Sequence, residues 1–290
     1  MIIKQYENAE IFLRNYEPIL LEKEAVSQTL LYEAGKSRDV LESSVSRYGA
    51  VLHLDEVHLL FTVTKSGELI LYCVRLDREE EASAVLAGYL GNAHILISGL
   101  SGKPLVCRHF IEHYSSYVKA TFLRGLETEI MELRQVNGIR PVPGHQRLAL
   151  PEEAKLTADW LIRFQIEAMI DETDYEEALS RAKRLIDRGE LYLYENVEKQ
   201  AVSMAAVSRK LVHGIVVTYV FTPEEHRGNG YAAANIYYLS KALLEQGYDF
   251  CTLFADKRNL LSNRAYEKVG YKVLEDYCEY KVLSCKEEDG

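Results

Sequence analysis

The stretch that decides the fold reads Phe221-Thr-Pro-Glu-Glu-His-Arg-Gly-Asn-Gly-Tyr-Ala-Ala-Ala234. Residues Ile215–Thr222, which lead into it, are rich in β-branched and aromatic side chains and predict a strand. Residues Asn229–Gln246 predict a helix, because apolar side chains recur at helical spacing, at Ala232, Ile236, Leu239 and Leu243. A strand therefore ends, a glycine-rich turn follows, and a helix begins.

This turn has the composition of an anion-binding loop. The first N–H groups of a helix have no partners within the helix, and the helix dipole adds partial positive charge there. Gly228 and Gly230 remove side chains where a phosphate would approach the backbone, and Ala232 keeps the next position small. The loop can therefore hold a pyrophosphate without many cationic side chains.

The same residues also fit a different nucleotide motif. Gly228-x-Gly230-x-x-Ala233 matches the dinucleotide-binding pattern, and Asp256 follows the next predicted strand, where a ribose-binding acid would sit. In that fold the first glycine follows the strand directly, whereas Pro223-Glu-Glu-His-Arg227 intervenes here. The neighbouring strands predict a hairpin meander rather than repeated crossover units, so a nicotinamide-dependent enzyme is an alternative only.

A second polar element follows, Asp256-Lys-Arg-Asn-Leu-Leu-Ser-Asn-Arg-Ala-Tyr-Glu-Lys-Val-Gly-Tyr271. It predicts a helix over Asn259–Val269 that ends at Gly270. At about 3.6 residues per turn, one face carries polar side chains and the opposite face carries apolar ones suited to the core. The polar face holds Asn259, Ser262, Asn263 and Tyr266, and the apolar face holds Leu261, Ala265 and Val269. A solvated surface is the simpler interpretation, but a polar stripe with Tyr and without Lys or Glu is less typical of plain surface.

Together the two elements resemble the GNAT superfamily of N-acetyltransferases. Its signature loop is Arg/Gln-x-x-Gly-x-Gly/Ala, and Arg227-Gly-Asn-Gly-Tyr-Ala232 fits that pattern. The later helix is equally characteristic, and the predicted order of elements, β α α β β β α β α β, also matches. The resemblance implies an α/β (α+β mixed-sheet) GNAT fold over roughly residues 145–290, as in two-part bacterial proteins with this domain at the C-terminus.

The resemblance also implies an activity and a site. The protein would be an acyl-CoA-dependent N-acyltransferase, moving an acetyl or short acyl group from acetyl-CoA to a primary amine by direct attack. Backbone amides of Arg227–Ala232 would hold the pyrophosphate, the strand end would pair with pantetheine, and Tyr266 would be the catalytic acid near the sulfur. The implied coenzyme-binding residues are Tyr219, Val220, Phe221, Thr222, His226, Arg227, Gly228, Asn229, Gly230, Tyr231, Ala232, Asn259, Ser262, Asn263 and Tyr266.

The sequence departs from many members of this superfamily at the expected base. They often place a Glu on the central strand, and Ile215–Thr222 contains no carboxylate. His213 at a turn is more typical of surface, and Glu224 and Glu225 lie beside the loop rather than at the reaction centre. No base is assigned, so a non-catalytic acyl-CoA-binding or regulatory module is the second hypothesis.

Two domains are expected. The Pro- and Gly-rich segment 136–145 predicts a linker between an accessory domain, 1–135, and a catalytic domain, 146–290. In the first half, Ala9–Gly35 predicts one helix and His94–Leu100 a strand, whereas Phe122–Gln135 fits either. This smaller α/β domain resembles a degenerate GNAT copy, although it has no Arg-x-x-Gly-x-Gly/Ala loop.

Composition limits the remaining choices. The chain has 290 residues, a net charge of −10, and five cysteines without a C-x-x-C pair, which favours reduced thiols in a cytoplasmic protein. The acidic balance argues against nucleic-acid or membrane partners, and no metal motif is present. The expected partner is a small-molecule or peptide amine; a homodimer, the acceptor's identity and the role of residues 1–135 stay open.

Overall fold

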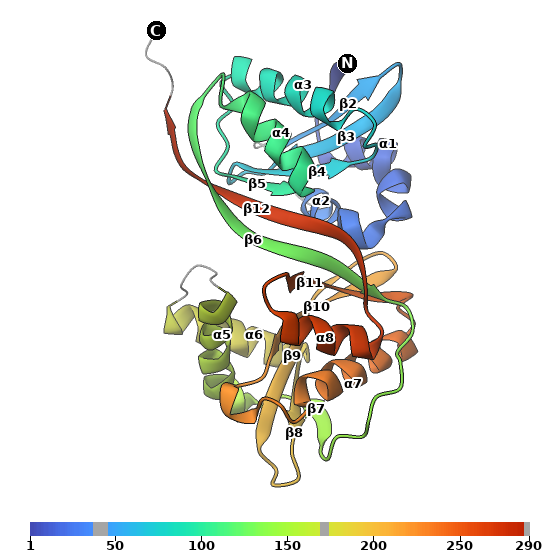
Figure 1. The fold of residues 1–290 in the computed structure, drawn as a ribbon, viewed down its shortest axis with the longest axis vertical. Coiled ribbons are helices and arrows are strands. Elements are labelled where there is room, and N and C mark those ends of the chain that lie inside the picture. The colour runs from blue at the N-terminus through green and yellow to red at the C-terminus, as the bar shows by residue number, and fades with distance from the viewer. Residues whose placement is uncertain (37–45, 169–173, 287–290) are drawn as a thin grey trace. The chain divides into compact units, whose positions relative to one another are not determined.

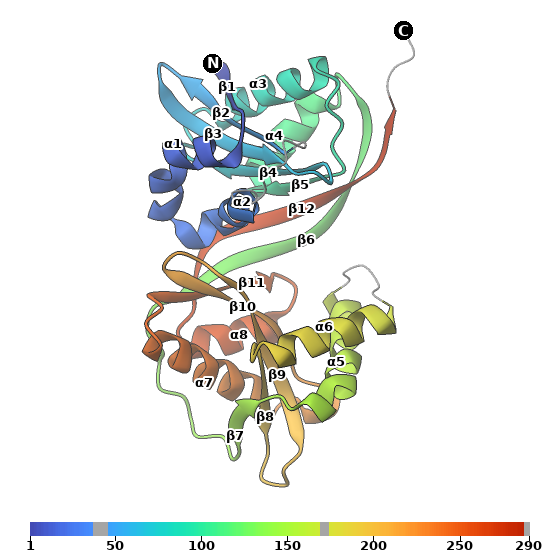
Figure 2. The ribbon, with the colours of Figure 1, turned by 180° about the vertical axis from the view of Figure 1, so that it is seen from behind.

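The computed structural model describes residues 1–36, 46–168 and 174–286 (Figures 1 and 2). The chain divides into two compact units: unit 1 comprises Met1–Thr128 and Glu275–Gly290, and unit 2 comprises Glu129–Leu274. No described helix is long and apolar enough to span a membrane. Cys73, Cys107, Cys251 and Cys278 are free thiols, and the side chain of Cys285 lies outside the described part.

Unit 1 is a sheet with a pair of helices on each face. Its strands follow the order β1-β2-β3-β4-β5-β12-β6. Because side chains alternate along a strand, Leu59, Phe61 and Val63 of β3 face α3 and α4 in one core cluster. The elements are β1 (Ile2–Tyr6), α1 (Ala9–Glu22), α2 (Glu24–Lys36), β2 (Arg47–His53), β3 (Glu56–Val63), β4 (Glu68–Cys73), α3 (Glu79–Asn92), β5 (Gly99–Gly102), α4 (Pro104–Tyr114), β6 (Lys119–Leu133) and β12 (Lys272–Lys286).

Unit 2 has the same layering, with strand order β6-β11-β10-β9-β8-β7. On β9, Ala205 and Val207 pack with α7 and α8, whereas Met204 and Ala206 pack with α5 and α6 on the other face. The elements are β7 (His145–Leu148), η1 (Pro151–Glu153), α5 (Ala154–Ala168), α6 (Tyr175–Asp187), β8 (Leu191–Glu195), β9 (Ala201–Lys210), β10 (Gly214–Phe221), η2 (Glu224–His226), α7 (Tyr231–Glu245), β11 (Phe250–Asp256) and α8 (Leu260–Val269).

The two halves of the chain repeat one order of elements. Apart from short 3-10 turns, residues 2–133 and 145–286 both read β α α β β β α β α β. Each half ends in a strand that neighbours the fifth strand of the other half: β12 pairs antiparallel with β5, and β6 lies next to β11. The mixed α/β fold is therefore confirmed, and the first half has the order of elements expected of a copy.

Several predicted elements differ in detail. The single helix expected over Ala9–Gly35 is two helices that break at Lys23, where the Ser27 hydroxyl donates to the carbonyl of Leu20. Strand β1 was not predicted, and β5 begins at Gly99 rather than His94. The ambiguous segment Phe122–Gln135 falls in strand β6. The last residues of the helix predicted over Ala158–Ile170 lie outside the described residues.

The compact units divide the chain at points other than segment 136–145. That segment lies within unit 2, where Val136 and Ile139 pack against the core and the Asn137 N–H donates to the Val269 carbonyl at 2.7 Å. Conversely, residues 275–290 belong to unit 1, because Cys278 of β12 is buried in its core. The division into domains 1–135 and 146–290 with a linker at 136–145 stays a prediction.

Candidate functional site

The candidate site lies where strands β10 and β11 of unit 2 separate. Their parallel ladder joins Gly214, Ile215 and Val216 to Phe250, Cys251 and Thr252. Within the described part of unit 2, no further pair joins them, although β10 continues to Phe221 and β11 to Asp256. The second half of β10 therefore has a backbone edge that an extended ligand could pair with.

β10 also changes register against its other neighbour, β9. The ladder shifts between Thr218 and Phe221, and Tyr219 inside this bulge has a φ of +50°. A bulge leaves residues unpaired and redirects the strand. The strand end predicted to contact pantetheine, Tyr219–Thr222, is thus irregular on one side and open on the other.

The loop after β10 is held by side chains from within itself. The Arg227 Nε donates to the Thr222 carbonyl at 2.9 Å, and the Asn229 amide donates to the carbonyls of His226 and Arg227 at 3.1 and 3.2 Å. Gly228 and Gly230 both have a φ of +82°, a region that favours glycine. The conformation of the loop is therefore set by the protein before any ligand arrives.

The backbone amides of this loop have no acceptor. Among the residues that the structure describes, the N–H groups of Gly228, Asn229, Gly230, Tyr231 and Ala232 make no hydrogen bond, and Ala234 is the first in α7 that does, to Gly230. Gly228, Asn229 and Gly230 are exposed. With Ala233, six successive free donors lie at this helix N-terminus, an arrangement that can bind an anion such as pyrophosphate.

Helix α5 is tied to this loop by two ion pairs. Glu167 accepts from Arg227 Nη2 at 2.6 Å, and Glu225 accepts from Arg163 at 3.0 Å. The hydrogen bond from Arg163 lowers the pKa of Glu225 to about 2. The Arg227 guanidinium is therefore engaged by a carboxylate and by Thr222, which leaves the loop amides as the available phosphate donors.

Helix α8 buries part of its polar face, Asn263 and Tyr266, whereas Asn259 at its N-cap is exposed. Asn259 caps the helix through Oδ1, which accepts from the Ser262 N–H, and Asn263 is buried with its amide donating to the Asp256 carbonyl at 3.1 Å. The Asn263 Oδ1 is buried without a hydrogen-bond partner. Leu261, expected on the buried face, is 74% exposed, because the turn after β11 uses the polar face of the helix for its contacts.

Tyr266 belongs to the core of unit 2. Its side chain is 7% exposed, and its ring makes an edge contact with that of Tyr271 at 6.1 Å. Burial raises the pKa of Tyr266 to about 12, against the opposing effect of a hydrogen bond with Ser262. The phenol is therefore protonated at neutral pH.

A buried polar network supports the end of β10, and the sequence analysis missed it. The hydroxyl of Ser203 on β9 donates to the Phe221 carbonyl at 3.1 Å and accepts from the Thr222 hydroxyl at 3.0 Å. Asn235 on α7 donates to the same oxygen at 3.4 Å, and Gln146 donates to Asn235 at 2.6 Å. A Ser within an apolar strand and an Asn on the apolar face of a helix were the available signals.

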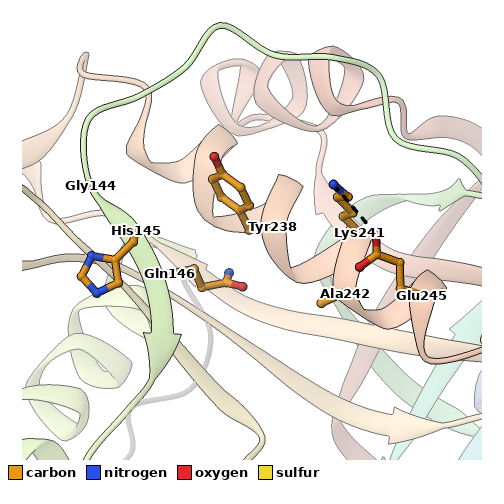
Figure 3. A pocket seen from close by; sticks show the side chains of 7 residues that line it. All are labelled: Gly144, His145, Gln146, Tyr238, Lys241, Ala242 and Glu245. Carbon is orange, nitrogen blue, oxygen red and sulfur yellow. Dashed lines mark ion pairs between the residues drawn. The ribbon is translucent and has the colours of Figure 1, made fainter.

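One pocket of unit 2 contains none of the predicted site residues (Figure 3). It has a volume of about 410 Å³ between β7 and α7. Lys241 and Glu245, the charged residues of this pocket, form an ion pair at 3.8 Å. Gln146 lines the pocket and hydrogen-bonds Asn235, which in turn hydrogen-bonds Ser203. The lining residues are Gly144, His145, Gln146, Tyr238, Lys241, Ala242 and Glu245. In residues 1–36, 46–168 and 174–286, no group of three or more His, Cys, Asp or Glu side chains could hold a metal ion.

Comparison with known proteins finds a family model that matches part of unit 2. Residues 155–271 match the model of the acetyltransferase (GNAT) family. No curated protein sequence matches the chain.

Solved structures extend the likeness to the whole chain. A GCN5-related N-acetyltransferase from Sphaerobacter thermophilus aligns over 97% of this chain and 95% of its own, with a TM-score of 0.60 and 13% identity. A GNAT-family acetyltransferase from Colwellia psychrerythraea aligns over 98% and 100%, with a TM-score of 0.54 and 13% identity. A tandem GNAT protein from the clavulanic acid biosynthesis pathway aligns over 96% and 98%, at 0.50 and 11%. The fold is shared over both halves, as the sequence predicted.

Proposed function

We propose that this protein acetylates a primary amine, because residues 155–271 match the model of the acetyltransferase (GNAT) family, whose members transfer acyl groups from acyl-CoA. The donor is acetyl-CoA or another short acyl-CoA, and the acceptor is a small molecule or a peptide. The observation that carries the proposal is the row of free amides from Gly228 to Ala232, directly after the open edge of β10.

The proposal places two parts of the coenzyme, the pyrophosphate and the pantetheine arm, against these two features. The loop amides bind the pyrophosphate, and the unpaired second half of β10 hydrogen-bonds the amides of pantetheine. The thioester then lies in the gap between β10 and β11, beside α8. In this proposal Asn259, Ser262 and Asn263 of α8 contact the pantetheine region, and His226 of η2 contacts the coenzyme beside the loop.

The reaction is a direct transfer. The neutral amine attacks the thioester carbonyl carbon, a C–N bond forms, and the C–S bond breaks as the thiolate of coenzyme A leaves. A backbone N–H at or next to the β10 bulge stabilises the negative charge on the carbonyl oxygen. The amine's proton passes to water, since β10 carries no carboxylate.

Tyr266 has a definite role in this scheme. A free thiol has a pKa of about 8.5, so complete proton transfer to the thiolate from a phenol with a pKa of about 12 is unfavourable. A difference of this size corresponds to roughly 5 kcal/mol against complete transfer. We therefore assign Tyr266 a hydrogen bond to the developing thiolate, with the proton finally supplied from solvent.

The nicotinamide alternative loses support from the sheet. β8, β9 and β10 pair antiparallel, whereas a dinucleotide-binding fold repeats parallel crossover units. The non-catalytic alternative shares the coenzyme site and differs only in turnover.

The test has two stages. Thermal-shift titration with acetyl-CoA, CoA, NAD and NADH measures binding, since a ligand at 100 times its Kd stabilises the folded state by about 2.7 kcal/mol. Thiol release is then followed with acetyl-CoA and a panel of amines. A raised melting temperature with CoA species, together with amine-dependent thiol release, supports the proposal. A raised melting temperature without thiol release indicates a non-catalytic binding module. No change in melting temperature, or a change with NAD(H) alone, refutes the coenzyme assignment.

A further inference from the structure

Tyr219 has a backbone conformation that its residue type disfavours. Of the described non-glycine residues with positive φ, it alone lies within a strand; Leu54, Asp55, His94 and Lys199 lie in turns or loops. A bulky residue at φ +50° is an outlier, and such strain persists only where surrounding contacts impose it. Because the bulge lies at the opening of β10, these contacts bear on the reaction centre.

Two side chains hold Tyr219. Arg181 of α6 donates from Nη1 to the Tyr219 hydroxyl at 3.2 Å, and Phe164 of α5 packs edge-on against its ring at a centroid distance of 5.7 Å. Arg181 is oriented in turn by Glu177, one helical turn earlier, which accepts from its Nη2 at 2.7 Å. The hydroxyl of Tyr219 is the polar end of this chain of contacts.

We infer that Arg181 is a positioning residue for acyl transfer, an inference that rests on the proposed function. By holding the phenol of Tyr219 it keeps the bulge of β10 in one conformation. The bulge sets the direction of the backbone N–H groups that follow it, and these are the donors assigned to the carbonyl oxygen. Arg181 thus acts on the oxyanion through Tyr219, without contacting the substrate.

This role predicts a specific kinetic signature. Donors aimed at the oxyanion act mainly in the transition state, so loosening them lowers kcat. The pyrophosphate loop is held by Arg227 and Asn229, which do not contact Arg181, so any rise in the KM for acetyl-CoA comes from the pantetheine contacts of β10 alone and is smaller than the fall in kcat. A misplacement of about 1 Å can cost about 100-fold in rate, so we expect a fall in kcat of roughly 10- to 100-fold.

The experiment compares Arg181→Met, Tyr219→Phe and the double variant, measured by thiol release with acetyl-CoA and the best amine. Both single variants should lower kcat by a larger factor than they raise the KM for acetyl-CoA, and the double variant should be no slower than the slower single, since both remove one interaction. Arg181→Lys should restore part of the rate, because Lys also donates. Arg184→Met is the matched control: Arg184 lies on the same helix but donates to Ser180.

The outcomes separate the two proposals. If the parent protein turns over but kcat is unchanged in Arg181→Met and Tyr219→Phe, the positioning role is refuted and acyl transfer is not. The same conclusion follows if the single variants change only KM, or if their losses in kcat add in the double variant. No turnover by the parent with any amine refutes acyl transfer and the positioning role with it. If Arg181→Met does not fold, Tyr219→Phe decides, because it removes only the hydroxyl that Arg181 contacts.

Discussion

Gly228→Ala tests whether the loop amides hold the coenzyme. Gly228 has a φ of +82°, and a Cβ added there would meet no protein atom within 4 Å. The cost to the free protein is therefore the backbone cost of placing an L-residue in the left-handed region, roughly 1–2 kcal/mol. For a unit of this size, each kcal/mol lowers Tm by about 2–4 °C.

Coenzyme binding should suffer a further loss. The new methyl group occupies the open space beside six free N–H groups, where the proposal puts the pyrophosphate. Losing one hydrogen bond to a charged group costs about 1.5–3 kcal/mol, and every 1.4 kcal/mol is tenfold in Kd. We expect the Kd for acetyl-CoA to rise by roughly 10- to 100-fold.

Gly247→Ala is the matched control. Gly247 follows the other end of the same helix, α7, with a φ of +100° and likewise nothing within 4 Å of an added Cβ. It carries the same backbone cost at a distance of roughly 22 Å from the loop. Thermal unfolding should show similar losses for both variants, and isothermal titration should show weaker coenzyme binding for Gly228→Ala alone. Equal Kd values for both variants would refute the assignment of the loop amides.

Three further predictions follow from the same site. Tyr266→Phe should lower kcat by about 100-fold or less, with little change in the KM for acetyl-CoA. Because burial raises the pKa of Tyr266 to about 12, the kcat of the parent protein should not fall below about pH 10 through loss of the Tyr266 proton. A parent kcat that falls above about pH 8, with no such fall in Tyr266→Phe, would contradict this prediction. Ser203→Ala removes a buried donor to the Phe221 carbonyl, so thermal unfolding should show a loss of about 1–3 kcal/mol and kinetics a higher KM for acetyl-CoA; unchanged stability would exclude a supporting role. Glu167→Gln weakens an ion pair whose two side chains are 43% and 40% exposed, so stability should change by less than about 1 kcal/mol, and added salt should narrow the difference from the parent; a larger loss would show that the pair is effectively desolvated.

Local patterns carried the prediction of the glycine-rich loop before α7. Positive φ at Gly228 and Gly230, the strand before them and the helix after them all follow from residues close in the chain. The glycines of the loop, the proline before it and the spacing of apolar residues in α7 each affect the backbone only within a few residues. This is why the conformation of the loop and the order of the elements around it could be predicted without coordinates, whereas coenzyme binding by the loop stays a prediction.

The interior of the site was less predictable. The faces of α8 were assigned from polarity, yet Asn263 and Tyr266 are buried and Leu261 is exposed. Polarity indicates the solvent side only when the buried side lacks polar partners, and here the Asp256 carbonyl supplies one to Asn263. The roles of Ser203 and Arg181 were invisible for a related reason: their partners, Phe221 and Tyr219, lie 18 and 38 residues away.

The sequence by itself determined most of the elements of unit 2, their order and the glycine-rich turn before α7, because propensity, glycine conformation and helix capping are short-range properties. Only the tertiary structure decided which strands complete each unit, since β12 pairs Cys278 with Gly102 across 176 residues. It also decided where β10 opens and bulges, because a register shift depends on both neighbouring strands at once. Long-range pairing of this kind leaves no local mark in the amino-acid sequence.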